Sequence, residues 1–157
     1  MLNKINKVKL AMVFLLLILP ALYVYYSIHK MLNDNLVIET SSRRIYRFKI
    51  EIADEPEEWK KGLMFRQELC EHCGMLFKLP ERVQQFWMKD TFIPLDIIYI
   101  DNKGIIKKIY KMTTPESLSP LSSEVSVNGV LEINGGMSDK LKISVGDEVF
   151  HPYFGNL

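Results

Sequence analysis

The strongest structural signal in the chain lies in residues 95–112, which read LDIIYIDNKGIIKKIYKM. Two runs rich in isoleucine and tyrosine, 95–100 and 105–112, flank a polar tetrapeptide that ends in Gly104. β-Branched and aromatic residues favour extended backbone, and glycine accepts the positive φ that a tight turn requires. The stretch therefore predicts a β-hairpin.

The segments on either side of this hairpin continue the β pattern. Apolar and polar residues alternate from Tyr46 to Ile52, which is the period of a strand with one buried face. Shorter apolar runs between turn residues predict further strands at 74–79, 84–88, 130–133 and 148–153. The sequence thus predicts a mainly β domain of the α+β class.

Two short helices and one long loop complete this prediction. Asp54 is a candidate helix cap, because Pro56 suits a first turn and Glu57 follows three residues after the cap. A second helical turn is expected at 138–142. Residues 113–126 are rich in serine, threonine and proline, which is typical of a surface loop. We expect the folded domain to span residues 45–157.

The N-terminal segment is long and apolar enough to cross a bilayer. Residues 10–28 contain no charged side chain, and a helix of that length spans about 30 Å, the thickness of the hydrocarbon core. We predict a transmembrane signal anchor there, followed by a tether over residues 29–44. A cleaved signal peptide and a buried globular helix are the alternatives, although no small-x-small cleavage site follows the apolar run.

The charges around this segment predict its orientation. Lys4, Lys7 and Lys9 precede it, whereas Lys30 is the only Lys or Arg that follows it before Arg43. Because cytoplasmic flanks of membrane spans are enriched in Lys and Arg, the first nine residues are expected in the cytoplasm. The protein is then a single-pass protein of the cell inner membrane, with its C-terminal domain periplasmic or extracellular.

The charge of the rest of the chain excludes a nucleic-acid partner. Three of the 20 Lys and Arg lie before residue 10, so 17 remain against 19 Asp and Glu, a net charge of about −2. A nucleic-acid-binding domain needs a dense basic face that displaces counterions from phosphates. The expected partners are therefore the membrane and an envelope protein or a saccharide.

Five short strings, in order along the chain, resemble the family known as domain of unknown function 192. They are GLMFR (62–66), GMLF (74–77), FWMKDT (86–91), PLDIIYID (94–101) and VLEINGG (130–136). This resemblance covers about residues 46 to 151 and implies a compact, barrel-like domain with an antiparallel or mixed sheet. The family is often exported behind a signal or an anchor, and its biochemical role is not established.

The chain departs from the family pattern at two places. The family usually has asparagine where this chain has Asp90, and it usually lacks cysteines. Any role of Cys70 and Cys73 therefore belongs to this protein and its close relatives. A structural disulfide between them is the preferred reading, because thiols outside the cytoplasm tend to be oxidised. Thiol exchange and metal binding are the alternatives.

No cofactor and no metal are expected. The chain has no P-loop, dinucleotide fingerprint or nucleophile elbow. A zinc site would need four ligands, and besides Cys70 and Cys73 no second ligand pair occurs at a zinc-binding spacing. Met64, Met75 and Met88 lie in the family strings near Trp87, where thioethers could bind Cu(I). Core packing is the better interpretation, since methionine commonly fills gaps between apolar side chains.

A binding cleft is the favoured functional site. Charged residues that stand among apolar neighbours must be paired or must line a pocket, and an aromatic side chain beside them suits a polar ligand. The predicted ligand-binding residues are Arg66, Trp87, Lys89, Asp90 and Asp96. For Asp96 a structural role is the preferred alternative, in which its carboxylate accepts from backbone N–H groups or from Arg66.

We expect a non-catalytic ligand- or protein-binding adaptor at the membrane surface. The rival is an envelope enzyme, either a thiol oxidoreductase at Cys70 and Cys73 or a hydrolase using Asp90 and Asp96. A structural envelope part recognised through the loop at residues 115–126 is the third reading.

Overall fold

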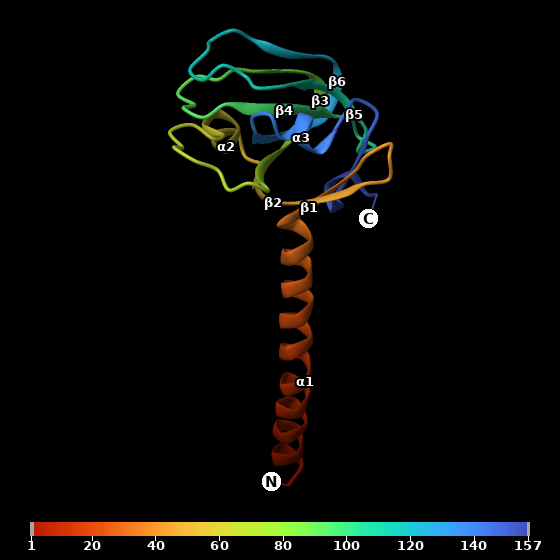
Figure 1. Cartoon of the computed structure of the whole chain (residues 1–157). Coiled ribbons are helices and arrows are strands. Elements are labelled where there is room, and N and C mark those ends of the chain that lie inside the picture. Colours follow the sequence, from red (N-terminus) through yellow and green to blue (C-terminus); the bar gives the residue numbers. More distant parts are fainter. Residues whose placement is uncertain (1, 157) are drawn as a thin grey trace. The chain divides into compact units, whose positions relative to one another are not determined.

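The computed structural model describes the backbone of residues 2–156 and the side chains of residues 15–156. The chain divides into two compact units, Met1–Leu32 and Asn33–Leu157 (Figure 1). The two units are described separately.

The first unit is one apolar helix. Helix α1 (Leu2–Asn33) contains Pro20, and its segment Leu15–Asn33 has the length and composition of a membrane span. A signal sequence has the same features, so the helix fits either assignment. The side chains of Lys4, Lys7 and Lys9, on which the predicted orientation depends, lie outside the described side chains.

The second unit is built on a seven-stranded sheet that curls into a half-barrel (Figure 1). Its strands, in the order of the sheet, are β5 (Ile106–Tyr110), β4 (Leu95–Ile100), β6 (Leu121–Asn134), β3 (Cys73–Phe86), β2 (Ile45–Ala53), β1 (Asn35–Glu39) and β7 (Glu148–Phe150). Neighbours are antiparallel except β2 and β3, which are parallel. The predicted mixed, barrel-like sheet is confirmed, as is the hairpin of β4 and β5.

An isolated bridge joins the two edges of this sheet. Ile105, just before β5, pairs with Glu148 at the start of β7. The backbone N–H of Ile106 donates to the Asp147 carbonyl at 3.0 Å, and the N–H of Gly146 donates to the Ile106 carbonyl at 2.9 Å. These bonds satisfy edge groups that would otherwise face solvent, and they hold the sheet in its curled form.

Two apolar clusters form because side chains alternate between the faces of each strand. In β6, Leu131 and Ile133 belong to one cluster, whereas Val130 belongs to the other. The second cluster also contains Leu63 and Met88, which come from the segments after α2 (Pro56–Lys61) and after β3. The candidate site lies at this second cluster.

Three short helical elements complete the domain: α2, α3 (Met137–Leu141) and the 3-10 turn η1 (Pro152–Phe154). The helix predicted after Asp54 is present, but Glu55 is its cap and forms a capping box with Glu58. The predicted turn at 138–142 corresponds to α3.

The structure corrects two boundaries at the ends of the domain. β1 lies inside the predicted tether of residues 29–44, and its Leu36 and Ile38 are fully buried, so the sheet begins before Ile45. At the other end, the strand predicted at 148–153 stops at Phe150, because proline at position 152 begins η1.

Two further corrections concern the long central strands. The segments 74–79 and 84–88 were predicted as two strands, but β3 runs through Pro80 with two register shifts against β6. The predicted loop at 113–126 ends at Pro120, since β6 starts at Leu121. Within β6, the Ser123 hydroxyl accepts a hydrogen bond from the backbone N–H of Gln84 at 3.0 Å. This bond gives the Gln84 amide a partner at the second register shift, between Val83 and Gln85.

Candidate functional site

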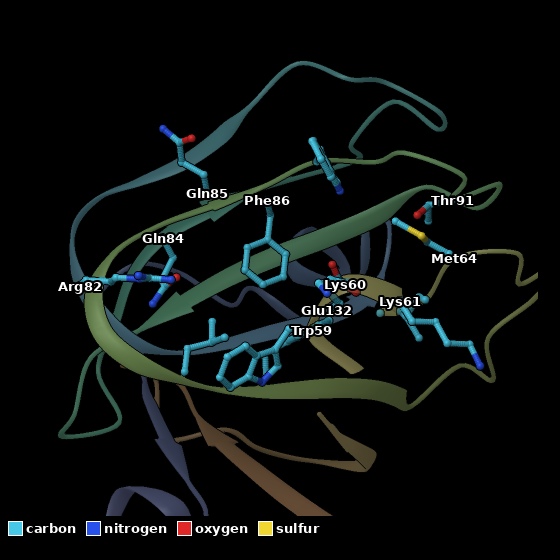
Figure 2. Close-up of a pocket in the computed structure, with 15 residues that line it drawn as sticks. Trp59, Lys60, Lys61, Met64, Arg82, Gln84, Gln85, Phe86, Thr91 and Glu132 are labelled. Atoms are coloured by element: carbon cyan, nitrogen blue, oxygen red, sulfur yellow. The ribbon is translucent and has the colours of Figure 1, made fainter. Parts of the chain in front are cut away.

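A cavity of about 190 Å³ lies between α2, the segment that follows it and the distal half of β3 (Figure 2). Its lining is Trp59, Lys60, Lys61, Gly62, Leu63, Met64, Phe77, Leu79, Arg82, Gln84, Gln85, Phe86, Trp87, Thr91 and Glu132. Sites for drug-sized ligands occupy roughly 300–1,000 Å³, so this cavity suits a smaller molecule.

Glu132 is the acidic residue of this pocket. It is 5% exposed, and strand alternation turns it to the same face as Val130. Figure 2 shows it among the labelled lining residues of the pocket. Its Oε2 has no hydrogen-bond partner within the described part of the chain. Burial raises the pKa of Glu132 to about 8, so the carboxyl group is largely neutral at pH 7 and can donate a hydrogen bond.

Gly62 provides the space beside this carboxyl group. Its φ is +46°, a backbone conformation that residues with a Cβ atom rarely adopt. A Cβ at this position would lie 3.1 Å from Cζ of Phe77 and 3.7 Å from Oε2 of Glu132. Glycine therefore both permits the turn after α2 and keeps the pocket open.

Aromatic side chains form the walls of the pocket. The Trp59 indole N–H donates to the Ala53 carbonyl at 3.1 Å, which fixes the ring against the end of β2. Phe86 packs edge-to-face on Phe77, with 4.9 Å between ring centroids. Trp87 is 55% exposed and lies at the opening. Both tryptophans of the chain thus line the pocket.

Basic side chains surround the opening. Lys60, Lys61 and Arg82 are exposed residues of the lining. Lys60 forms an exposed ion pair with Glu57 at 3.0 Å, whereas Lys61 and Arg82 take part in no salt bridge among the residues that the structure describes. With Glu132 neutral, the lining carries net positive charge.

The structure does not gather the five predicted cleft residues in one pocket. Of these, Trp87 lines the cavity and the other four do not. Lys89 is exposed. Asp90 has a φ of +52°. Its backbone carbonyl accepts a hydrogen bond from the backbone N–H of Phe65 at 2.7 Å, which links the segment after β3 to the segment after α2.

Arg66 and Asp96 bind other parts of the protein. Arg66 makes two hydrogen bonds of 2.6 Å to the Glu51 carboxylate, which lower the pKa of Glu51. Asp96 is fully buried and accepts from the backbone N–H groups of Met112, Gly136 and Ser138 at 2.7–2.8 Å. These hydrogen bonds agree with a structural role for Asp96, and its ligand-binding role stays a prediction.

Cys70 and Cys73 are joined by a disulfide. The adjacent loop is also held by Asn134, whose side-chain amide donates to the carbonyls of Cys70 at 2.8 Å and Leu69 at 3.2 Å. No group of three or more His, Cys, Asp or Glu that could hold a metal ion is found in the described part of the chain.

Sequence reasoning missed most of the pocket. Glu132 was recognisable as a charged residue between Leu131 and Ile133, but its pocket was not. Gly62 begins a family string, but the pocket beside it was not predicted. Trp59 and Arg82 belong to segments that come together only after β3 curls, so no local pattern identified them as lining residues.

Comparison with known proteins places the domain among uncharacterised relatives. The family model DUF192, described as "Uncharacterized ACR", matches residues 37–151. A Sinorhizobium meliloti 1021 protein described as a "putative transcription regulator" is 32% identical, with a TM-score of 0.75 over 76% of this chain and 93% of that one. A Novosphingobium aromaticivorans DSM 12444 protein of unknown function is 37% identical, with a TM-score of 0.71 over 74% of this chain and 83% of that one. No curated protein matches the chain.

Proposed function

This chain belongs to the uncharacterised DUF192 family, and from that premise we propose that its domain is a non-catalytic module that binds a small polar ligand in the pocket at Glu132. The unpartnered carboxyl oxygen of Glu132 carries the proposal. A buried polar group without a hydrogen bond costs roughly 1–3 kcal/mol, and a ligand that supplies the missing partner recovers part of that cost.

The walls of the pocket support a saccharide as the ligand. The faces of Trp59 and Trp87 offer apolar surface for a sugar ring, and Gln85 and Thr91 add polar groups to the lining. The cavity of about 190 Å³ suits a monosaccharide or the terminal residue of a longer chain.

The surroundings of Asp90 and Asp96, the two carboxylates of the hydrolase hypothesis, favour binding over hydrolysis. Both oxygens of Asp96 accept backbone N–H groups and the side chain is fully buried, so it has no access to a substrate. Asp90 lies outside the pocket lining. The hydrolase hypothesis therefore loses one of its two residues.

We place this module at the outer surface of a membrane, held there by α1. The support is the length and apolar composition of Leu15–Asn33, together with the Lys residues before it. A saccharide or an envelope protein would be met in that compartment.

Intrinsic fluorescence offers a direct test, because both tryptophans line the pocket. The full-length chain in detergent micelles is titrated with D-glucose, N-acetyl-D-glucosamine and D-glucuronate. We expect a saturable change in emission with at least one sugar, and a tenfold or larger loss of affinity in Glu132→Leu. Glu132→Gln retains a hydrogen-bond donor and should bind at pH 6 as the wild type does.

Circular dichroism and thermal melting establish that each variant is folded. A wild-type protein that shows no saturable change with any of the three sugars would contradict the saccharide proposal. Equal affinity of the wild type and a folded Glu132→Leu variant would remove Glu132 from the site.

A further inference from the structure

The pocket has a basic opening and an acid that is neutral inside it. Figure 2 places Arg82 at one end of the pocket and Lys61 at the other, with Glu132 between them. Lys60 adds a third basic side chain to the lining, and Glu132 is the only acidic residue among the lining residues that the structure describes. A ligand that enters therefore meets positive potential first.

Two acids beside this opening, Glu51 and Glu57, have basic partners. The Glu51 carboxylate, which lies near Lys61, is held by two hydrogen bonds of 2.6 Å from Arg66. Glu57 pairs with Lys60 at 3.0 Å, but both side chains are largely exposed, so solvent screens that pair. Lys61 interacts electrostatically with Glu51, but neither Lys61 nor Arg82 forms a salt bridge among the residues that the structure describes.

The interior favours a hydrogen-bond acceptor over a cation. A neutral carboxyl group donates its O–H and has no charge with which to hold an ammonium group. Burial keeps Glu132 largely in this form at pH 7, because its pKa is raised to about 8. A cationic ligand would be repelled by the basic side chains of the lining before it reached Glu132.

We infer that the ligand of this pocket is a small hydroxylated carboxylate of the uronic-acid class, whose anionic group lies at Lys61 or Arg82 and whose oxygen accepts from Glu132. The inference rests on the proposed function and adds the charge of the ligand. The aromatic walls contact the sugar ring, and the basic side chains distinguish an acidic sugar from neutral and cationic ones.

The test compares three sugars that share one ring: D-glucuronate, D-glucose and D-glucosamine. Titration of the full-length chain at pH 6.5 and low salt, followed by tryptophan fluorescence, should give at least tenfold higher affinity for glucuronate than for glucose. Glucosamine should bind weakest. The preference for glucuronate should shrink at 0.5 M salt, because exposed charges are screened.

Charge-removal variants identify the residues responsible. The double variant Lys61→Gln with Arg82→Gln should lose most of the preference for glucuronate over glucose. The matched control Lys103→Gln with Lys107→Gln removes two lysines outside the pocket lining and should leave the preference unchanged.

The two proposals fail in different ways. Binding of glucose or glucosamine as tightly as glucuronate would overturn the inference and leave the saccharide site in place. A preference that survives in a folded Lys61→Gln and Arg82→Gln variant would overturn the assigned residues. Absence of binding by these three sugars and by N-acetyl-D-glucosamine would overturn the proposed function and the inference with it.

Discussion

Glu132 couples the stability of the domain to pH. Its pKa is about 8 in the folded protein and close to 4.5 in an unfolded chain, so the folded state binds more protons between these values. The free energy of unfolding should therefore fall as pH rises from about 4.5 to about 8, by up to ~1.4 kcal/mol per pH unit from this residue. The total is on the order of 5 kcal/mol.

The substitution Glu132→Gln removes this proton uptake. We expect the variant to match the wild type near pH 4.5 and to exceed its stability by a few kcal/mol at pH 8, as measured by urea unfolding at several pH values. Glu57→Gln is the control, because that side chain is 85% exposed and its removal should change stability by less than about 1 kcal/mol. A wild type and Glu132→Gln variant with parallel pH profiles would show that Glu132 is ionised in the folded protein.

Asp96 is another buried carboxyl group, and both of its oxygens accept hydrogen bonds from backbone N–H groups. The substitution Asp96→Asn replaces one acceptor oxygen by an N–H₂ group that faces backbone donors from Met112, Gly136 or Ser138. We expect a loss of roughly 3 kcal/mol in thermal or urea unfolding. The same change at the exposed Asp139, which pairs with Lys111, should cost less than about 1 kcal/mol. Equal effects at the two positions would refute the structural role of Asp96.

At this residue scale, the sequence identified which charged groups are unusual but not what each one contacts. Asp96 and Glu132 both stand between apolar neighbours, yet one meets three backbone amides and the other meets an open pocket. The difference depends on segments far away in the chain. Trp87 was predicted as a site residue from its sequence neighbours alone. It lines the pocket because the segment after β3, to which it belongs, forms part of the pocket wall.

Among the elements, the loop closed by Cys70 and Cys73 has two independent supports. The disulfide closes a four-residue segment, and such a short loop contributes only about 2 kcal/mol in the chain-entropy account. Asn134 holds the same loop through the carbonyls of Leu69 and Cys70. The domain should therefore stay folded after reduction.

Unfolding in urea with and without dithiothreitol measures this contribution. We expect reduction to lower the free energy of unfolding by about 2 kcal/mol and to leave the far-ultraviolet circular dichroism unchanged. In the double variant Cys70→Ala with Cys73→Ala, dithiothreitol should leave the free energy of unfolding unchanged. Unfolding of the wild-type domain by reductant alone would mean that Asn134 does not hold the loop.

Strands with regular alternation were the elements that the sequence predicted well. β2 and the hairpin of β4 and β5 have one continuous pattern each, so their bounds were close. β3 and β6 were misjudged because they bend: Pro80 and the register shifts break the period of two, and serines replace apolar residues in the first half of β6. The pocket is formed by this bend, so the part of the fold that sequence reasoning missed is also the part that forms the site.

On the scale of the whole molecule, the proposed location of the domain depends on the orientation that α1 would take as a membrane span. Lys4, Lys7 and Lys9 precede the apolar segment and should keep the N-terminus in the cytoplasm, which carries the domain across the membrane. Alkaline phosphatase fused after Leu157 should then be active, since it needs an oxidising compartment. Replacement of all three lysines by glutamine should lower that activity several-fold, whereas Lys30→Gln should preserve it. The mass of the purified protein separates an anchor from a signal sequence, because an anchor retains residues 1–28 and a cleaved signal does not. A reporter active only in the cytosol would place the disulfide and the pocket in a reducing compartment and remove the grounds for an envelope ligand.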